Sequence, residues 1–296
     1  VAGWIGVAAS FLIMSYYSVI AGWGLNYIFM SLNQFYIGKS SADIAEIFNT
    51  LESSWDITLF WHFAFTALTV AVVLPGVRKG VEHWSRYMTT GLLVILLCLC
   101  AYSFTLDGFS EAVKFLFYPD FKEFKASSAM EALGLALFNL SLGQGIMLTY
   151  GSYMRRSEDI PKTSMISASM IITVSILAGL MIFPIIFTFG STPQGGPGLV
   201  FKTLPLLFSK LPGALVVSTA FFSLFVFTAL TSSIALVEVV SANFMDLLGW
   251  SRKKAVLIVG ASCFTFGIPS ALSKTGTLFA NWSFLYGKDF FQTIDS

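Results

Sequence analysis

The chain alternates long apolar stretches with short polar ones. Seven apolar stretches lie at about 4–31, 57–75, 88–106, 130–153, 166–189, 214–245 and 254–272. An α-helix rises 1.5 Å per residue, so about 20 residues cross the roughly 30 Å of bilayer hydrocarbon. The pattern therefore predicts an all-α integral membrane protein with seven spans. An eighth apolar segment begins near Phe290, just before the chain ends, and we expect it to be the start of another span.

Composition supports this class. Hydrophobic residues make up 56% of the 296 residues and charged residues only 11%, whereas soluble domains carry about 25% charged residues. The net charge of +1 gives no indication of nucleic-acid binding. The three cysteines lie inside apolar stretches without a CxxC motif, so neither zinc nor a disulfide framework is indicated. Because no catalytic motif is found either, the sequence does not favour an enzyme. Its start at Val1 indicates a fragment of a longer protein.

The charges of the links predict an orientation. The links at 76–87, 154–165 and 246–254 carry nine of the 17 Lys and Arg residues and four acids; the links on the other side carry eight cations and eleven acids. Short loops rich in Lys and Arg stay in the cytoplasm. We therefore expect a multi-pass protein of the cell (plasma or inner) membrane, with the first span starting inside and lipid around the spans.

The fourth stretch, 130–153, is a poor helix near 141–145. Gly143 and Gly145 flank Gln144, and each glycine costs a helix about 1 kcal/mol relative to alanine. Asn139 and Ser141 add side chains that compete for backbone hydrogen bonds. An unwound segment within the membrane must line a cavity or hold a ligand, as in many secondary transporters. The alternative is that the glycines only permit close helix packing.

The sixth stretch carries hydroxyl groups and an acid. Thr228, Thr231 and Ser232 offer neutral oxygens that suit an alkali cation such as Na⁺, although such side chains also bond back to helix carbonyls. Glu238 follows Thr231 by two turns on the same face and is the single carboxylate deep in a span. An intramembrane acid is either a functional group, here a possible proton site, or a hydrogen-bonded link between helices.

Four short strings of the chain resemble the bacterial sodium-dependent amino-acid transporters of the neurotransmitter:sodium symporter family. They are NLSLGQG from residue 139, TYGSY from 149, GLVF from 198 and LTSSI from 230, in the family's order and spacing. The resemblance implies an inverted-repeat sodium-symporter fold with a discontinuous helix, here a single partial domain over residues 1–296 that starts in the family's third helix. It also implies sodium-coupled import of an amino acid or related amine by alternating access.

The resemblance assigns roles to particular residues. Tyr17 would bind the substrate carboxylate, Phe138 would cover the substrate, and Ser141 would meet it in the unwound segment. The other implied substrate-site residues are Ile13, Ile20, Gln144, Ser232 and Leu236. For Na⁺ the resemblance implies Asn139 at one site, and Thr231, Ser232 and the carbonyl of Thr228 at another. Asp246 and Tyr153 would belong to the cytoplasmic gate.

Three departures from the family keep alternatives open. Gln144 replaces a usually apolar or aromatic wall residue, which bears on the preferred side chain. Ile171 stands where the family usually has an amide or acid near the first sodium, which leaves open a non-transporting receptor or subunit of the same fold. Leu135 replaces the glutamine of chloride-dependent members, so chloride is not expected. A proton-coupled transporter using Glu238 is the other alternative.

Overall fold

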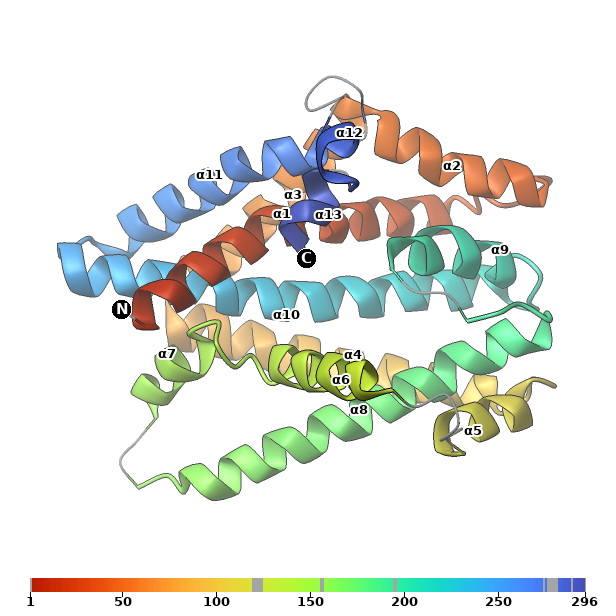
Figure 1. The fold of residues 1–296 in the computed structure, drawn as a ribbon, viewed down its shortest axis with the longest axis horizontal. Coiled ribbons are helices and arrows are strands. Elements are labelled where there is room, and N and C mark those ends of the chain that lie inside the picture. Colours follow the sequence, from red (N-terminus) through yellow and green to blue (C-terminus); the bar gives the residue numbers. More distant parts are fainter. Residues whose placement is uncertain are drawn as a thin grey trace. The chain divides into compact units, whose positions relative to one another are not determined.

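The computed structural model describes residues 2–118, 125–154, 157–193, 196–273, 275, 282–288 and 290–295 (Figure 1). Within these residues all regular structure is helical, which confirms the all-α prediction. The elements are α1 (Ala2–Leu32), α2 (Ser41–Ser53), α3 (Trp55–Val73), η1 (Val77–Glu82), α4 (His83–Ser103), α5 (Phe109–Phe117), α6 (Ala126–Asn139), α7 (Ile146–Tyr153), α8 (Ile160–Thr188), η2 (Leu199–Thr203), α9 (Leu204–Phe208), α10 (Ala214–Leu248), α11 (Arg252–Ala271), α12 (Trp282–Tyr286) and α13 (Phe290–Asp295).

In the described part of the chain, six helical stretches are long and apolar enough to cross a membrane. They are Gly3–Leu32, Trp55–Val73, Val77–Ser103, Ile160–Thr188, Ala214–Leu248 and Arg252–Ala271. The predicted stretch 130–153 instead forms two shorter helices, α6 and α7, with residues 140–145 between them. Arg155 and Arg156, which contribute to the predicted orientation, lie outside the described residues.

The chain divides into two compact units. Unit 1 comprises Val1–Gly6 and Val94–Gln194, and unit 2 comprises Val7–Leu93 and Gly195–Ser296. Unit 1 therefore holds the C-terminal part of α4 together with α5 to α8. Unit 2 holds nearly all of α1, together with α2, α3, α9, α10 and α11.

Small residues let the helices of unit 2 approach closely. A Cβ atom on Gly22 of α1 would lie 2.7 Å from the Trp61 carbonyl oxygen of α3. A Cβ atom on Gly267 of α11 would lie 2.4 Å from the Ser15 carbonyl oxygen and 2.6 Å from the His62 ring. Glycine is therefore required at both crossings, in keeping with small residues at membrane helix interfaces. His62 is fully buried at the second crossing, and its Nε2 lies 3.0 Å from the Phe264 carbonyl oxygen.

Aromatic side chains form a further part of the core of unit 2. Phe48 of α2 stacks on Phe201 of η2 with ring centroids 5.4 Å apart, and Trp23 of α1 meets both rings edge-on. The Tyr27 hydroxyl donates a 2.7 Å hydrogen bond to the Phe201 carbonyl. Buried tyrosine needs such a polar partner. These contacts hold α2 and η2 against α1 and fix the polar link between α1 and α3.

In unit 1, α8 receives a series of hydrogen bonds from the preceding helices. Cys100 Sγ lies 3.0 Å from the Leu177 carbonyl oxygen, and Ser103 Oγ donates to the Met181 carbonyl at 2.9 Å. The Gly108 N–H donates to Thr188 Oγ1 at 3.0 Å. The acceptors follow each other by four and then seven residues, about one and two turns of α8, so the C-terminal part of α4 and the start of α5 are fixed to one face of it.

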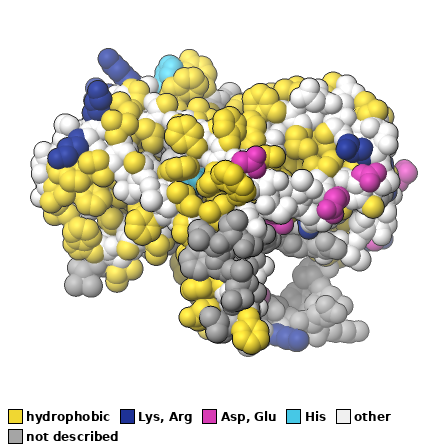
Figure 2. Space-filling view, turned by 90° about the horizontal axis from the view of Figure 1, so that it is seen from above, with side chains coloured by type: hydrophobic (Ala, Val, Ile, Leu, Met, Phe, Trp, Pro, Cys, Tyr) yellow, Lys and Arg dark blue, Asp and Glu magenta, His cyan; other side chains and the backbone are white. Residues whose placement is uncertain are grey.

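Charged side chains are separated on the face shown in Figure 2. Dark-blue Lys and Arg side chains gather at the left-hand end of the view, and most magenta Asp and Glu side chains gather towards the right-hand end. This separation follows the alternation of basic and acidic links along the sequence. The orientation in which the short basic links face the cytoplasm stays a prediction.

Candidate functional site

The discontinuous helix is the part of unit 1 that the sequence singled out. Helix α6 ends at Asn139 and α7 begins at Ile146, so six residues leave the helix. Ser141 (φ 54°), Gly143 (φ 84°) and Gly145 (φ 75°) adopt left-handed backbone conformations. Such angles are easy for glycine and uncommon for serine. The two glycines therefore allow the chain to turn twice and restart as a helix, which is the break expected near 141–145.

The first residues of α1 pack on this break. A Cβ atom on Gly6 would lie 3.0 Å from the Gly145 nitrogen and 3.1 Å from its Cα. Gln144, the polar residue between the two glycines, is only 8% exposed. Its burial places an amide with both donor and acceptor capacity beside the unwound backbone. Asn139 and Phe138, at the end of α6, are exposed in this chain, and Ser141 is half-buried.

The hydroxyl residues of α10 form a compact group of oxygens in unit 2. Thr231 Oγ1 donates a 2.8 Å hydrogen bond to the Thr228 carbonyl, and Thr228 Oγ1 donates to the Leu224 carbonyl at 2.9 Å. The Thr231 hydroxyl and the Thr228 carbonyl, both predicted to bind Na⁺, are therefore adjacent. These bonds are also the back-bonding pattern of the alternative interpretation. A cation that took both oxygens would replace the hydrogen bond between them.

Tyr17 of α1 stands opposite these oxygens. Its hydroxyl has the Ser232 hydroxyl as a hydrogen-bonding neighbour, so α1 and α10 meet at the two predicted polar residues. Leu236, one turn beyond Ser232, is 3% exposed, and Ile13 and Ile20 are half-buried on α1. Unit 2 therefore brings Tyr17 next to Ser232, and the part of these residues in substrate or sodium binding stays a prediction.

Glu238 is fully buried and has a partner that the sequence analysis did not identify. Arg252, the first residue of α11, donates from Nη1 to Oε1 at 3.1 Å and from Nη2 to Oε2. The same guanidinium donates from Nε and Nη2 to the Val73 carbonyl at the end of α3, at 3.2 and 2.9 Å. This bidentate pair joins three helices. A buried acid needs a cation as its partner, and the next basic residue along the chain after Glu238 is Arg252. This requirement was the sequence signal for the pair.

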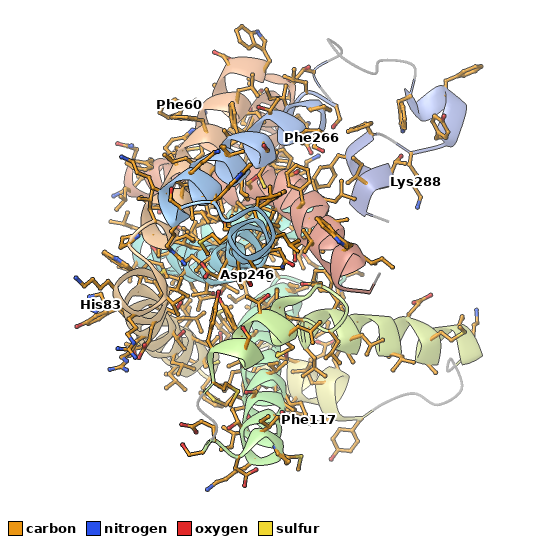
Figure 3. All side chains as sticks on the ribbon, turned by 90° about the vertical axis from the view of Figure 1, so that its left-hand side faces the viewer. Phe60, His83, Phe117, Asp246, Phe266 and Lys288 are labelled. Atoms are coloured by element: carbon orange, nitrogen blue, oxygen red, sulfur yellow. The ribbon has the colours of Figure 1, made fainter. Side chains whose placement is uncertain are left out.

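The predicted gate residues lie in different units. Asp246 is exposed near the end of α10, and Figure 3 labels it. Tyr153 ends α7, is 42% exposed, and has the Tyr150 ring 6.5 Å away. Their part in a gate stays a prediction.

Comparison with known proteins agrees with this geometry. The family model for the sodium:neurotransmitter symporter family matches residues 33–291. An uncharacterized sodium-dependent transporter, YhdH, of Bacillus subtilis is 41% identical over 293 residues, which are 99% of this chain and 64% of that protein. An uncharacterized sodium-dependent transporter of Haemophilus influenzae is 33% identical and covers 99% of this chain and 65% of that protein.

A solved structure shows the same fold. The crystal structure of MhsT in complex with L-phenylalanine superposes with a TM-score of 0.87 at 37% identity, over 99% of this chain and 66% of that one. The chain belongs to the sodium:neurotransmitter symporter family, a family of membrane transporters rather than enzymes. It spans just under two thirds of the length of the relatives named above.

Proposed function

We propose that the protein containing this chain is a sodium-coupled symporter for an amino acid. The observation that carries the proposal is the arrangement in unit 2, where the phenol of Tyr17 neighbours Ser232 and the Thr231 hydroxyl lies 2.8 Å from the Thr228 carbonyl. A phenol can donate to a carboxylate, and neutral oxygens are suitable ligands for Na⁺. A site that combines both can bind an amino acid and its driving ion.

Each residue then has a defined task. The Tyr17 hydroxyl binds the substrate carboxylate, while Thr231, Ser232 and the Thr228 carbonyl bind one Na⁺. For unit 1 the resemblance implies that Asn139 would offer an oxygen to a second Na⁺, and that Ser141 and Gln144 would meet the substrate. Phe138 covers the bound substrate. Alternating access follows from exposing these groups to one side of the membrane at a time, with Asp246 and Tyr153 in the cytoplasmic gate.

The pocket residues favour an apolar or aromatic amino acid. The resemblance assigns Ile13, Ile20 and Leu236 of unit 2 to the substrate site, and these side chains are apolar; it also assigns to the substrate the aromatic ring of Phe138 in unit 1. The relative MhsT has been solved with L-phenylalanine, which is a substrate of this kind. Gln144 offers one polar group to the side chain and favours a substrate with some polarity. Chloride coupling is not part of the proposal, because Leu135 offers no polar group.

Proton coupling through Glu238 is a weaker second candidate. Both oxygens of the carboxylate accept hydrogen bonds from the Arg252 guanidinium, which also binds the Val73 carbonyl of α3. A carrier of protons must release and rebind them during the cycle. The ion pair therefore supports a structural task for Glu238. Ile171 is the residue that favours a receptor of the same fold, but a receptor does not need the oxygens of α10 that are proposed to bind Na⁺.

Binding of tritiated L-phenylalanine to the purified protein tests the proposal, with unlabelled amino acids as competitors. We expect binding in NaCl and at least tenfold weaker binding in KCl. Tyr17→Phe removes one hydrogen bond to a charged group, worth about 1.5–3 kcal/mol, and should weaken binding roughly 10- to 100-fold.

Tyr16→Phe is the matched control, because Tyr16 is the neighbouring tyrosine and its ring packs instead against Phe291, with centroids 5.7 Å apart. Its binding should stay near the wild-type value. Sodium-independent binding, or an equal loss in both variants, would contradict the assigned role of Tyr17.

A further inference from the structure

One corner of unit 2 carries exposed cations that no acid neutralises. Arg78 and Lys79 lie in η1, and Lys253 and Lys254 lie at the start of α11; all four are exposed. Among the described residues none of the four has a carboxylate within 4.0 Å. Glu82, the acid of the same link, is paired at 3.3 Å with Arg86 instead.

The two cation pairs share one surface. The turn before η1 and the first residue of α11 lie close together, since a Cβ atom added to Gly76 would come within 3.8 Å of Arg252 Nε. Arg252 also holds the Val73 carbonyl just before this turn. Arg78 and Lys79 follow Gly76 by two and three residues, and Lys253 and Lys254 follow Arg252 directly. The buried Glu238–Arg252 pair therefore fixes the four exposed cations at one corner of unit 2.

Aromatic residues accompany the cations. Trp84 is 50% and Tyr87 is 63% exposed at the start of α4. Trp250 stacks on Phe244 with centroids 5.3 Å apart, and Lys254 Nζ lies 4.6 Å from the centre of the Trp250 ring. Exposed Trp and Tyr are typical of the headgroup level of a bilayer. In Figure 3, His83 marks the start of α4 at the outer edge of unit 2, among side chains with nitrogen tips.

These features match the chemistry of one kind of ligand. A lipid phosphate is an anion that Arg binds through two parallel hydrogen bonds and Lys binds as a point charge. The cytoplasmic leaflet holds anionic lipids, and basic pockets between membrane helices on that side bind their headgroups. Apolar side chains such as Leu257 and Ile258, 45% and 40% exposed on α11 just beyond the cations, can contact acyl chains.

We propose that Arg78, Lys79, Lys253 and Lys254 form a binding site for the headgroup of an anionic phospholipid, at the cytoplasmic junction of α3, η1 and α11. The bound lipid would link the start of α4 to the start of α11 at the protein surface. Arg252 links α3, α10 and α11 in the protein interior. The site is separate from the substrate and sodium residues, and it does not depend on which substrate is carried.

Native mass spectrometry of the purified protein tests the site with phosphatidylglycerol as the probe. We expect wild type to retain at least one phosphatidylglycerol, and to retain phosphatidylcholine at least tenfold less. Two variants, Arg78→Gln with Lys79→Gln and Lys253→Gln with Lys254→Gln, should each lower retention of phosphatidylglycerol about tenfold.

Two controls separate the site from charge in general and from misfolding. Lys39→Gln with Lys125→Gln removes two exposed cations outside this corner and should leave retention unchanged. Lys253→Arg with Lys254→Arg keeps the charges and should also retain the lipid.

Three results would overturn the site: equal retention in all variants, an equal loss in the Lys39 and Lys125 control, or a loss in only one of the two cation pairs. Competition by inorganic phosphate as strong as competition by phosphatidylglycerol would assign the corner to a free anion and overturn the lipid proposal.

Discussion

Replacing Arg252 with alanine is expected to destabilise the protein by about 3–5 kcal/mol. The change leaves the Glu238 carboxylate fully buried and without its cation, and removing one partner of a buried ion pair costs this much. It also removes both donors to the Val73 carbonyl at the end of α3. Unfolding of the purified protein in mixed micelles, followed by tryptophan fluorescence, measures the loss.

A second variant separates two causes of the lost stability: the unpaired charge of Glu238 and the lost contacts of the Arg252 side chain. Arg252→Ala combined with Glu238→Gln removes both charges and should recover at least half of the lost stability, because a neutral amide costs less to bury than a carboxylate. Lys253→Ala, next to Arg252 but exposed, should change stability by less than about 0.5 kcal/mol. If Arg252→Ala were as stable as Lys253→Ala, the pair would not hold the three helices together.

Replacing Thr231 with valine and Ser232 with alanine is expected to remove sodium-dependent substrate binding. Both changes keep the approximate shape of the side chains but delete the two hydroxyl oxygens proposed to bind Na⁺. The Thr231 change also deletes the hydrogen bond to the Thr228 carbonyl, which is 2.8 Å long. The sodium concentration needed for half-maximal binding should rise tenfold or more, which corresponds to about 1.4 kcal/mol.

The same helix provides a matched control. Ser218 and Thr219 form another serine–threonine pair, about three turns before the proposed site. Ser218→Ala with Thr219→Val also removes one serine and one threonine hydroxyl group from α10, but away from the proposed sodium site. This variant should leave the sodium dependence of binding unchanged. An equal shift in the two double variants would mean that the hydroxyl residues serve helix packing, as the alternative interpretation of the sequence holds.

The helices were predictable because each depends mainly on its own composition. The stretch 214–245 is continuously apolar and folds as α10 between Ala214 and Leu248. The break between α6 and α7 was predictable for the same reason, since Gly143 and Gly145 lie in an otherwise apolar segment. Both glycines adopt left-handed backbone angles, which end the helix and let the chain turn.

Contacts between segments that are distant in the sequence were harder to predict. Arg252 lies 14 residues after Glu238 and is the next basic residue along the chain, but nothing in the local pattern shows that its guanidinium also reaches the Val73 carbonyl of α3. The start of α4 is another example, since the span expected from residue 88 begins earlier, at His83, after the π-helical turn η1. That turn depends on the φ of 101° at Gly76 and on its contact with Arg252, which is tertiary information.

The pairing of Tyr17 with Ser232 lies between these cases. Tyr16 and Tyr17 point about 100° apart on α1, so their sequence alone does not tell which one faces a site. The resemblance selected Tyr17, and in unit 2 its hydroxyl has Ser232 as a neighbour. The oxygens of α10 that are proposed to bind Na⁺ were selected by their type and by the resemblance, whereas the 2.8 Å distance between the Thr231 hydroxyl and the Thr228 carbonyl comes from the structure.

Uptake of labelled amino acids by the intact protein in proteoliposomes tests the central claim most directly. An inward sodium gradient would be compared with an equal potassium gradient and with an inward proton gradient. Sodium-coupled symport predicts accumulation above the external concentration with sodium alone, and loss of that accumulation in the Thr231→Val, Ser232→Ala variant. Accumulation that follows the proton gradient without sodium, or binding without any accumulation, would contradict it.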